Sequence, residues 1–101
     1  PLPSDANASL LDLVADIAAE APDVHVEQQE MTHMVRRWID AMPIKQRIVI
    51  LRRFGLDHGT PATLDEIADE LGVTRERVRQ IQNIALKKLR KMLEKLEARK
   101  K

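Results

Sequence analysis

The sequence contains no cysteine and no tyrosine, and it has only one tryptophan and one phenylalanine. Without cysteine, neither disulfide bonds nor thiolate metal sites can form, which is compatible with a reducing cytoplasm. The core must be built from Leu, Ile, Val, Ala and Met, a set that suits helices better than an aromatic-rich sheet. Three glycines and five prolines supply few of the turns that an all-β fold needs. These absences predict an all-α protein.

Long apolar runs are absent as well. The longest, such as residues 48–51, are far too short to span a membrane, and the chain opens without the cationic and apolar stretches of a signal peptide. We therefore expect a cytoplasmic protein with no membrane partner. Because the chain begins with Pro1 instead of methionine, we also expect it to be a piece of a longer protein.

Signs of catalysis or cofactor binding are missing too. The sequence has no Gly-rich phosphate loop and no nucleophile paired with a base. Its three histidines, His25, His33 and His58, are scattered and lack the close ligand spacing of a metal site. The prediction is a protein that is not an enzyme and that has no catalytic residues, no cofactor and no metal.

The net charge of +1 conceals a strong asymmetry between the two ends of the chain. Residues 1–30 contain seven acidic side chains and no Lys or Arg, whereas residues 74–101 contain eleven Lys and Arg and only three Glu. Such polarity suggests two different partners, and the basic end is typical of a protein that binds a polyanion. The alternative is a basic face that is merely solvated.

The acidic end shows weak signals for structure. Residues 1–9 lack apolar periodicity and are typical of a linker. Residues 10–18 have apolar side chains at helical spacing, but the segment is too short to be stable without a partner surface. Residues 20–30 are acidic and are expected to be flexible. We therefore expect residues 1–27 to be a flexible acidic arm in front of a domain over residues 28–101.

Apolar side chains with helical periodicity predict one helix over residues 27–41 and a second over residues 44–54. Pro43 fits the first turn of the second helix, where proline is tolerated. The expected buried stripe of this second helix alternates with Lys and Arg and consists of Ile44, Ile48 and Leu51, with Val49 as a further candidate. Gly55 marks the end of this helix, and residues 58–61 are expected to form a loop.

Two more helices are predicted from capping signals. Thr63 and Glu66 have the spacing of a capping box, in which each side chain bonds to the backbone N–H of the other residue. A helix is therefore expected over residues 64–71, followed by Gly72, which adopts the left-handed turn conformation at little cost. Thr74 is positioned to cap a last, long helix that could extend to Ala98. The four helices should form a right-angled bundle.

Residues 64–81 carry the pattern of a helix-turn-helix. Two helices that cross steeply through a short turn need a small residue at their closest approach, a residue tolerant of positive φ in the turn, and apolar side chains on the facing sides. Ala68, Gly72 and Val78 fill these three roles. The alternative is an ordinary αα-hairpin. Because the three residues lie between two predicted helix caps, the pattern favours the DNA-binding motif.

The exposed face of the last helix has side chains suited to base recognition. Its expected buried stripe recurs at three- and four-residue steps: Val78, Ile81, Ala85, Leu89, Met92 and Leu96. Polar residues in its first turns fall on another face: Arg75, Glu76, Arg79, Gln80 and Asn83. In helix-turn-helix proteins this part of the second helix meets base edges, where Arg pairs with guanine, Gln with adenine and Glu with the cytosine amine. The alternative is a solvated, salt-bridged surface.

The run LRRFGLDHGTPATLDEIADELGVTRERVRQIQNIALKKLR, residues 51–90, resembles region 4 of a bacterial sigma factor of the sigma-70 family. Within it, VTRERVRQI is highly specific to that family. The preceding WIDAMPIKQRIVILRR, together with SLLDLVAD at residues 9–16, is similar to the end of region 3 and the start of region 4. Gln82 stands where a housekeeping sigma factor usually has Glu, which favours the stationary-phase or general-stress branch.

The resemblance implies recognition of the promoter −35 element in double-stranded DNA, by a domain docked on the β flap of core RNA polymerase, in transcription initiation. It assigns base recognition to Arg75, Glu76, Arg79 and Gln80. It places five residues near backbone phosphates: Arg53, Thr63, Leu64, Asp65 and Arg77. Three apolar residues match the groove that binds the flap: Phe54, Leu56 and Leu89. Three basic residues match a surface that activators touch: Lys87, Lys88 and Arg90.

For the acidic arm, the resemblance implies a linker similar to region 3.2, which runs near the polymerase active site and through the RNA exit channel. Composition alone leaves a flexible spacer as an equal alternative. Activators or an anti-sigma factor are further partners that the resemblance implies. Ile84 departs from the family pattern, because housekeeping sigma factors often have Lys there, and this puts the response to some activators in doubt.

Two other functions fit parts of the pattern. The DNA-binding domain of a response-regulator-type transcription factor also ends in a helix-turn-helix, but it would lack the RRFGL element and the acidic arm. A protein-interaction module would use the long basic helix as its docking face. Binding to −35 sequence variants and to the β flap distinguishes these hypotheses.

Overall fold

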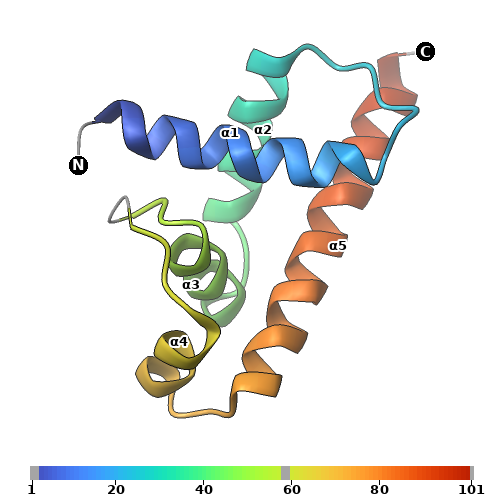
Figure 1. Ribbon diagram of the computed structural model, residues 1–101. Helices are drawn as coiled ribbons and strands as arrows, with labels where there is room; N and C mark the ends of the chain where they lie inside the picture. Colours follow the sequence, from blue (N-terminus) through green and yellow to red (C-terminus); the bar gives the residue numbers. More distant parts are fainter. Residues whose placement is uncertain (1–2, 58–59, 101) are drawn as a thin grey trace.

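A computed structural model of the chain describes residues 3–57 and 60–100, and Figure 1 shows their arrangement. These residues form five helices: α1 (Pro3–Ala19), α2 (Gln28–Asp40), α3 (Ile44–Arg53), α4 (Leu64–Leu71) and α5 (Arg75–Lys100). No strand is present in the described ranges, so the all-α prediction is confirmed. The predicted loop over residues 58–61 lies partly outside them, since His58 and Gly59 are not described. No helix of the described ranges is both long and apolar enough to cross a bilayer.

The predicted capping signals mark where α4 and α5 begin. Thr63 Oγ1 accepts a hydrogen bond from the Glu66 N–H at 3.1 Å, and the Glu66 carboxylate accepts one from the Thr63 N–H at 2.9 Å. This reciprocal capping box satisfies two backbone N–H groups at the start of the helix, which have no partner within it. Thr74 Oγ1 accepts from the Arg77 N–H at 3.1 Å in the same way, and α5 follows. Both helix starts therefore result from local side-chain chemistry.

The corner between α2 and α3 lies close to the predicted position. α2 begins and ends within one residue of the expected range. Pro43, however, is the residue before α3, with φ −52° and ψ 146°, and not part of its first turn. The extended ψ of Pro43 turns the chain between the two helices.

α3 separates two apolar clusters, and this position explains its burial pattern. Val49 belongs to the cluster shared with α4 and the start of α5, whereas Ile50 belongs to the cluster shared with α1, α2 and the later part of α5. Successive helical residues point about 100° apart, so a helix that packs on two sides buries neighbours in sequence. The predicted apolar positions of α3 are therefore only partly correct. Val49 is fully buried, whereas Ile44 is 58% exposed and Ile48 and Leu51 are only partly buried.

α5 is the longest element, and every other helix packs against it. The predicted stripe is correct as far as Leu89, since Val78, Ile81, Ala85 and Leu89 are all buried. Beyond that point Leu93 is fully buried, whereas the expected Met92 and Leu96 are only partly so. The four-residue step from Leu89 to Leu93 keeps the stripe facing α1 and α2, whose side chains share this cluster.

α1 differs from the expected flexible arm. It is helical from Pro3 to Ala19, and Figure 1 shows it lying across α2 and α5. Its apolar side chains enter the same buried cluster as side chains of those two helices. Residues 10–18 are predicted to need a partner surface, and the domain itself supplies that surface. The physical reason for the difference is that burying these side chains offsets the conformational entropy that is lost when the segment becomes ordered.

Candidate nucleic-acid interface

The turn between α4 and α5 sets how the two helices cross. Gly72 has φ +68° and ψ +34°, in the left-handed region that glycine adopts at little cost. The Val73 N–H donates to the Ala68 carbonyl at 3.1 Å, which closes the end of α4. Ala68 and Val78 are both buried in the cluster between the helices. The predicted residues therefore fill the three roles that a helix-turn-helix requires.

A charged clamp joins α3 to α4. The Arg52 guanidinium donates from Nε and Nη2 to the Glu70 carboxylate at distances of 2.7 to 3.2 Å. The hydrogen bond to Glu70 is the main reason why the pKa of Arg52 is raised. The sequence does not reveal this pair, because the partners are 18 positions apart and no local pattern connects them. The clamp holds α4 on α3 and so helps to orient the start of α5.

The four residues predicted to recognise bases lie together on the exposed face of the first turns of α5: Arg75, Glu76, Arg79 and Gln80. Arg79 donates to the Glu76 carboxylate from Nε at 2.8 Å and from Nη2 at 2.6 Å. These hydrogen bonds are the main reason why the pKa of Glu76 is lowered. Glu76 is therefore ionised at neutral pH and holds the Arg79 guanidinium in place.

Two further contacts tie this face to its surroundings. Arg75 Nε lies 3.9 Å from Asp65 Oδ1 in the first turn of α4. Arg77 Nη1 donates to Gln80 Oε1 at 3.3 Å along α5. Exposed contacts of this kind contribute little to stability. Of the two, only the Arg75–Asp65 ion pair places polar side chains of α4 and α5 next to each other.

Of the five residues predicted to lie near phosphates, Arg77 is exposed in the first turn of α5, and the other four belong to α3 and to the start of α4. Thr63 uses its N–H and its hydroxyl in the capping box, and Asp65 faces Arg75. Leu64 is half-buried and packs against the helix-turn-helix cluster. Arg53 Nη1 donates to the Ala62 carbonyl at 3.1 Å, so it fixes the segment that leads into α4. Thr63 and Asp65 are exposed, whereas Leu64 and Arg53 are partly buried.

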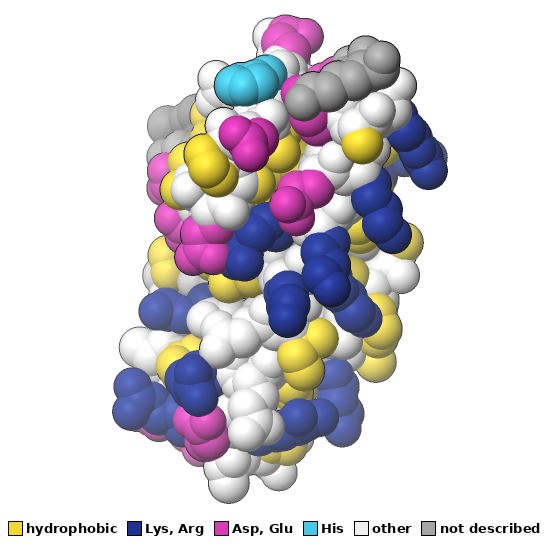
Figure 2. Space-filling model, turned by 90° about the vertical axis from the view of Figure 1, so that its right-hand side faces the viewer, with side chains coloured by type: hydrophobic (Ala, Val, Ile, Leu, Met, Phe, Trp, Pro, Cys, Tyr) yellow, Lys and Arg dark blue, Asp and Glu magenta, His cyan; other side chains and the backbone are white. Residues whose placement is uncertain are grey.

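Figure 2 shows the side of the molecule along which α5 runs, with Lys and Arg side chains gathered over its middle and acidic side chains towards its upper left. Lys87 and Lys88 are exposed, and Lys88 Nζ donates to Gln46 Oε1 of α3 at 3.1 Å. Arg90, by contrast, has Nη2 2.6 Å from Glu20 Oε2, just after α1. The predicted basic surface thus contains two exposed lysines and an arginine that the N-terminal segment engages.

The three apolar residues matched to a polymerase groove belong to one region of the core. Leu89 is 0% exposed and Leu56 is 5% exposed, and Phe54 packs against their cluster. The same cluster contains buried side chains of α1. These residues are therefore brought together as a groove would require, in a cluster to which α1 also contributes.

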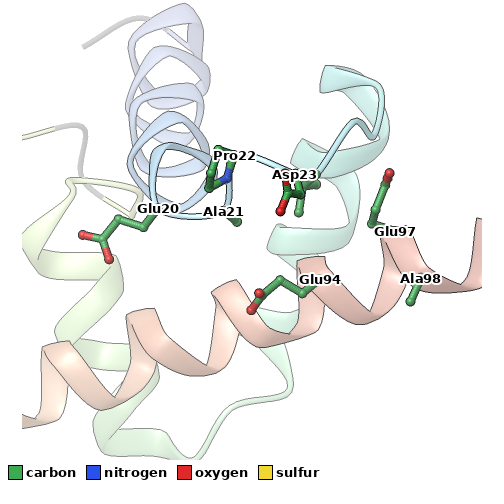
Figure 3. Close-up of a pocket in the computed structure, with 8 residues that line it drawn as sticks. Glu20, Ala21, Pro22, Asp23, Glu94, Glu97 and Ala98 are labelled. Carbon is green, nitrogen blue, oxygen red and sulfur yellow. The ribbon is translucent and has the colours of Figure 1, made fainter.

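An acidic pocket lies between the segment after α1 and the last turns of α5 (Figure 3). Four carboxylates contribute to its lining: Glu20, Asp23, Glu94 and Glu97. Glu20 points away from the other three, in agreement with its ion pair to Arg90. Within residues 3–57 and 60–100, no group of three or more His, Cys, Asp or Glu side chains is arranged to hold a metal ion. His58 of the sequence analysis lies outside this range.

The helix-turn-helix and its surroundings match the family described as Sigma-70, region 4, over residues 38–91. This match covers more than half of the chain. The chain belongs to the sigma-70 region 4 family. α3, α4 and the first part of α5 lie inside the matched residues, whereas α1 and most of α2 precede them. Membership confirms the resemblance and disfavours a response-regulator-type domain.

A curated sigma-70 relative extends the similarity over nearly the whole chain. The protein named RNA polymerase sigma factor RpoS, from Coxiella burnetii (strain RSA 493 / Nine Mile phase I), is 36% identical over 94 residues. The aligned part covers 93% of this chain and 27% of that relative, so the chain spans little more than a quarter of its length. This similarity supports the stationary-phase branch. No solved structure matches the chain.

Proposed function

We propose that this chain recognises the promoter −35 element while docked on the β flap of RNA polymerase, as the C-terminal domain of a stress-type sigma factor. It would serve transcription initiation without catalysis of its own. The observation that carries the proposal is the exposed row of Arg75, Glu76, Arg79 and Gln80 on a helix-turn-helix that belongs to the sigma-70 region 4 family. The row lies at the start of α5, the part of such a helix that meets base edges.

Arg79 is the best-placed residue for recognising guanine. Its guanidinium has five N–H donors, of which the Nε donor and one on Nη2 are used by Glu76. The remaining donors can form the bidentate pair with guanine O6 and N7 while Glu76 stays in contact. Because Glu76 already orders the Arg79 side chain, less conformational entropy is lost on binding than for an unpaired arginine. Glu76 therefore supports the contact and can accept from a neighbouring cytosine amine.

Phosphate contacts would position α5 in the groove without reading sequence. Arg77 lies beside the base-reading row, and the segment held by Arg53 and Thr63 leads into α4 next to it. Lys87 and Lys88 extend the positive charge along α5. These cations attract DNA of any sequence, and their share of the affinity falls as salt is added.

Docking on the polymerase would supply the affinity that so small an interface lacks, because tethering raises the local concentration of the chain at the promoter. Phe54, Leu56 and Leu89 would provide the apolar groove for the flap. Residues 1–27 would run near the active site and along the RNA exit channel. An activator or anti-sigma factor would use the surface of Lys87, Lys88 and Arg90.

A comparison of Arg79→Ala with Lys88→Ala tests the base-reading role. The assay is fluorescence anisotropy of labelled −35 duplexes, with one base pair varied at a time, binding to the chain in the presence of core RNA polymerase. Arg79→Ala should weaken binding to the preferred sequence by about ten- to a hundredfold and relax preference at one base pair. Lys88→Ala should weaken all duplexes alike and reduce the salt slope by about one. Equal losses from both variants on every duplex would contradict the proposal.

A further inference from the structure

α1 packs a regular stripe of apolar side chains into a groove, which is formed by the side chains of α2 and α5 that share its buried cluster. Leu10, Leu13, Val14 and Ile17 follow the i, i+3, i+4, i+7 spacing that places them on one face of a helix, and all four are buried. They enter the same cluster as buried side chains of α2 and α5, across which α1 lies in Figure 1. Leu11, on the other side of α1, is 38% exposed. The contact is therefore one-sided and amphipathic.

The floor of this groove includes the residues assigned above to polymerase docking. Leu56 and Leu89 belong to the cluster that α1 helps to bury, and Phe54 packs against it. Phe54 and Leu86 also line one hollow together with Asp16 of α1. An external helix that contacts this floor would take the place of α1. The two helices cannot occupy the groove at the same time.

Charged side chains border the groove and match the charge of α1. Asp12 and Asp16 line a hollow together with Arg53. Just after α1, Glu20 Oε2 lies 2.6 Å from Arg90 Nη2. Carboxylates of α1 and of the segment after it therefore lie near arginines at two places along the border of the groove.

α1 is not perfectly fitted to this place. Arg90 Nε is buried without a hydrogen-bond partner, the one such side-chain nitrogen or oxygen atom in the part of the chain that the structure describes. Burying an N–H without a partner costs free energy, and the ion pair to the exposed Glu20 returns little of it. α1 is thus held mainly by its apolar stripe.

We infer that α1 is an internal occupant of the polymerase-docking groove and that docking on the flap requires α1 to leave. The inference rests on the proposed docking of this chain on the β flap. The external partner is then an amphipathic helix with the apolar spacing of α1 and with carboxylates opposite Arg53 and Arg90. Release of α1 exposes the groove and frees residues 1–27 for the course through the polymerase that is proposed above.

Amide hydrogen exchange of the unmodified chain, with and without core RNA polymerase, tests the inference directly. In the free chain, amides of residues 13–17 should be protected, because they lie in a packed helix. In the complex, the exchange of these amides should become at least about tenfold faster, whereas residues 86–90 of α5 should remain protected. A chain that binds polymerase and keeps α1 fully protected would overturn the inference.

Matched variants separate a failure of the inference from a failure of docking. The apparent dissociation constant rises as the fraction of chains with an open groove falls, so Leu13→Ser should tighten binding to core polymerase by roughly fivefold or more. Leu11→Ser, on the exposed face, should not change it. If the unmodified chain binds polymerase but Leu13→Ser does not bind it more tightly, docking stands and the role of α1 is wrong. If neither the unmodified chain nor Leu13→Ser binds polymerase, the docking proposal itself fails. If Leu13→Ser does not fold, the hydrogen-exchange experiment on the unmodified chain decides whether α1 leaves the groove.

Discussion

Alanine at Gly72 and alanine at Gly55 should destabilise the protein to clearly different degrees, although both glycines have φ near +70°. The left-handed backbone costs an alanine roughly 1 kcal/mol. At Gly72 this is the whole cost, because an added Cβ meets no atom within 4 Å. At Gly55 an added Cβ lies 2.9 Å from the Pro61 nitrogen and from the Thr60 carbonyl carbon, so backbone atoms must shift. Overpacking adds about 1–3 kcal/mol, which gives a total of about 2–4 kcal/mol for Gly55→Ala.

Thermal and urea unfolding followed by far-UV circular dichroism measure this difference. For a domain of this size, each kcal/mol lowers the Tm by about 4–8 °C, so Gly72→Ala should lose roughly 5 °C and Gly55→Ala at least about twice as much. Gly72→Asn is a control, because Asn adopts the left-handed region more readily than Ala and should be nearly neutral. Gly55→Asn should stay costly, since its Cβ meets the same backbone atoms. Equal losses at the two positions, or a larger loss at Gly72, would refute the reasoning.

Three further predictions concern helix packing and capping. Leu13→Ala should lower the free energy of unfolding by about 2 kcal/mol or more, whereas Leu11→Ala should change it by less than about 0.5 kcal/mol; equal effects in urea titrations would mean that α1 is not packed. Thr63→Ala should cost about 1 kcal/mol and Thr63→Ser much less, in the same titrations; a neutral Thr63→Ala would show that the capping box does not stabilise α4. The pKa of Glu66 is lowered, first by the hydrogen bond from the Thr63 backbone, so its stabilising contribution is present above its ordinary pKa of 4.5 and is lost as the pH falls through the lowered value. The free energies of unfolding of the unmodified chain and of Glu66→Gln should therefore approach each other as the pH falls below 4.5. A difference between them that stays constant with pH would contradict this.

The elements that sequence analysis predicts best are those specified by neighbouring residues. The capping box of Thr63 and Glu66, the left-handed Gly72 and the cap at Thr74 each act within a few positions, and the structure contains all of them. The buried stripe of α5 follows from its period as far as Leu89. The exposed face that carries Arg75, Glu76, Arg79 and Gln80 follows from the same period. Local chemistry and periodicity were therefore sufficient to locate the helix-turn-helix.

Features that depend on distant partners could not be predicted in this way. The burial of Val49 and Ile50 results from two clusters on opposite sides of α3, and a single-stripe pattern does not describe such a helix. The Arg52–Glu70 clamp joins residues that share no local motif. The burial of Leu56 and Leu89 in one cluster with side chains of α1 depends on how α1, α2 and α5 pack together. In each case the missing information is tertiary contact.

The central claim is that the chain reads −35 promoter DNA from the surface of RNA polymerase. The most direct test is footprinting of a promoter by core polymerase with the unmodified chain, on a series of templates that carry single base-pair changes in the −35 element. We expect protection of the −35 region that requires the chain and that is lost on templates altered at the positions facing Arg79 and Gln80. Protection that is absent with the chain, or that is indifferent to every −35 change, would contradict the claim.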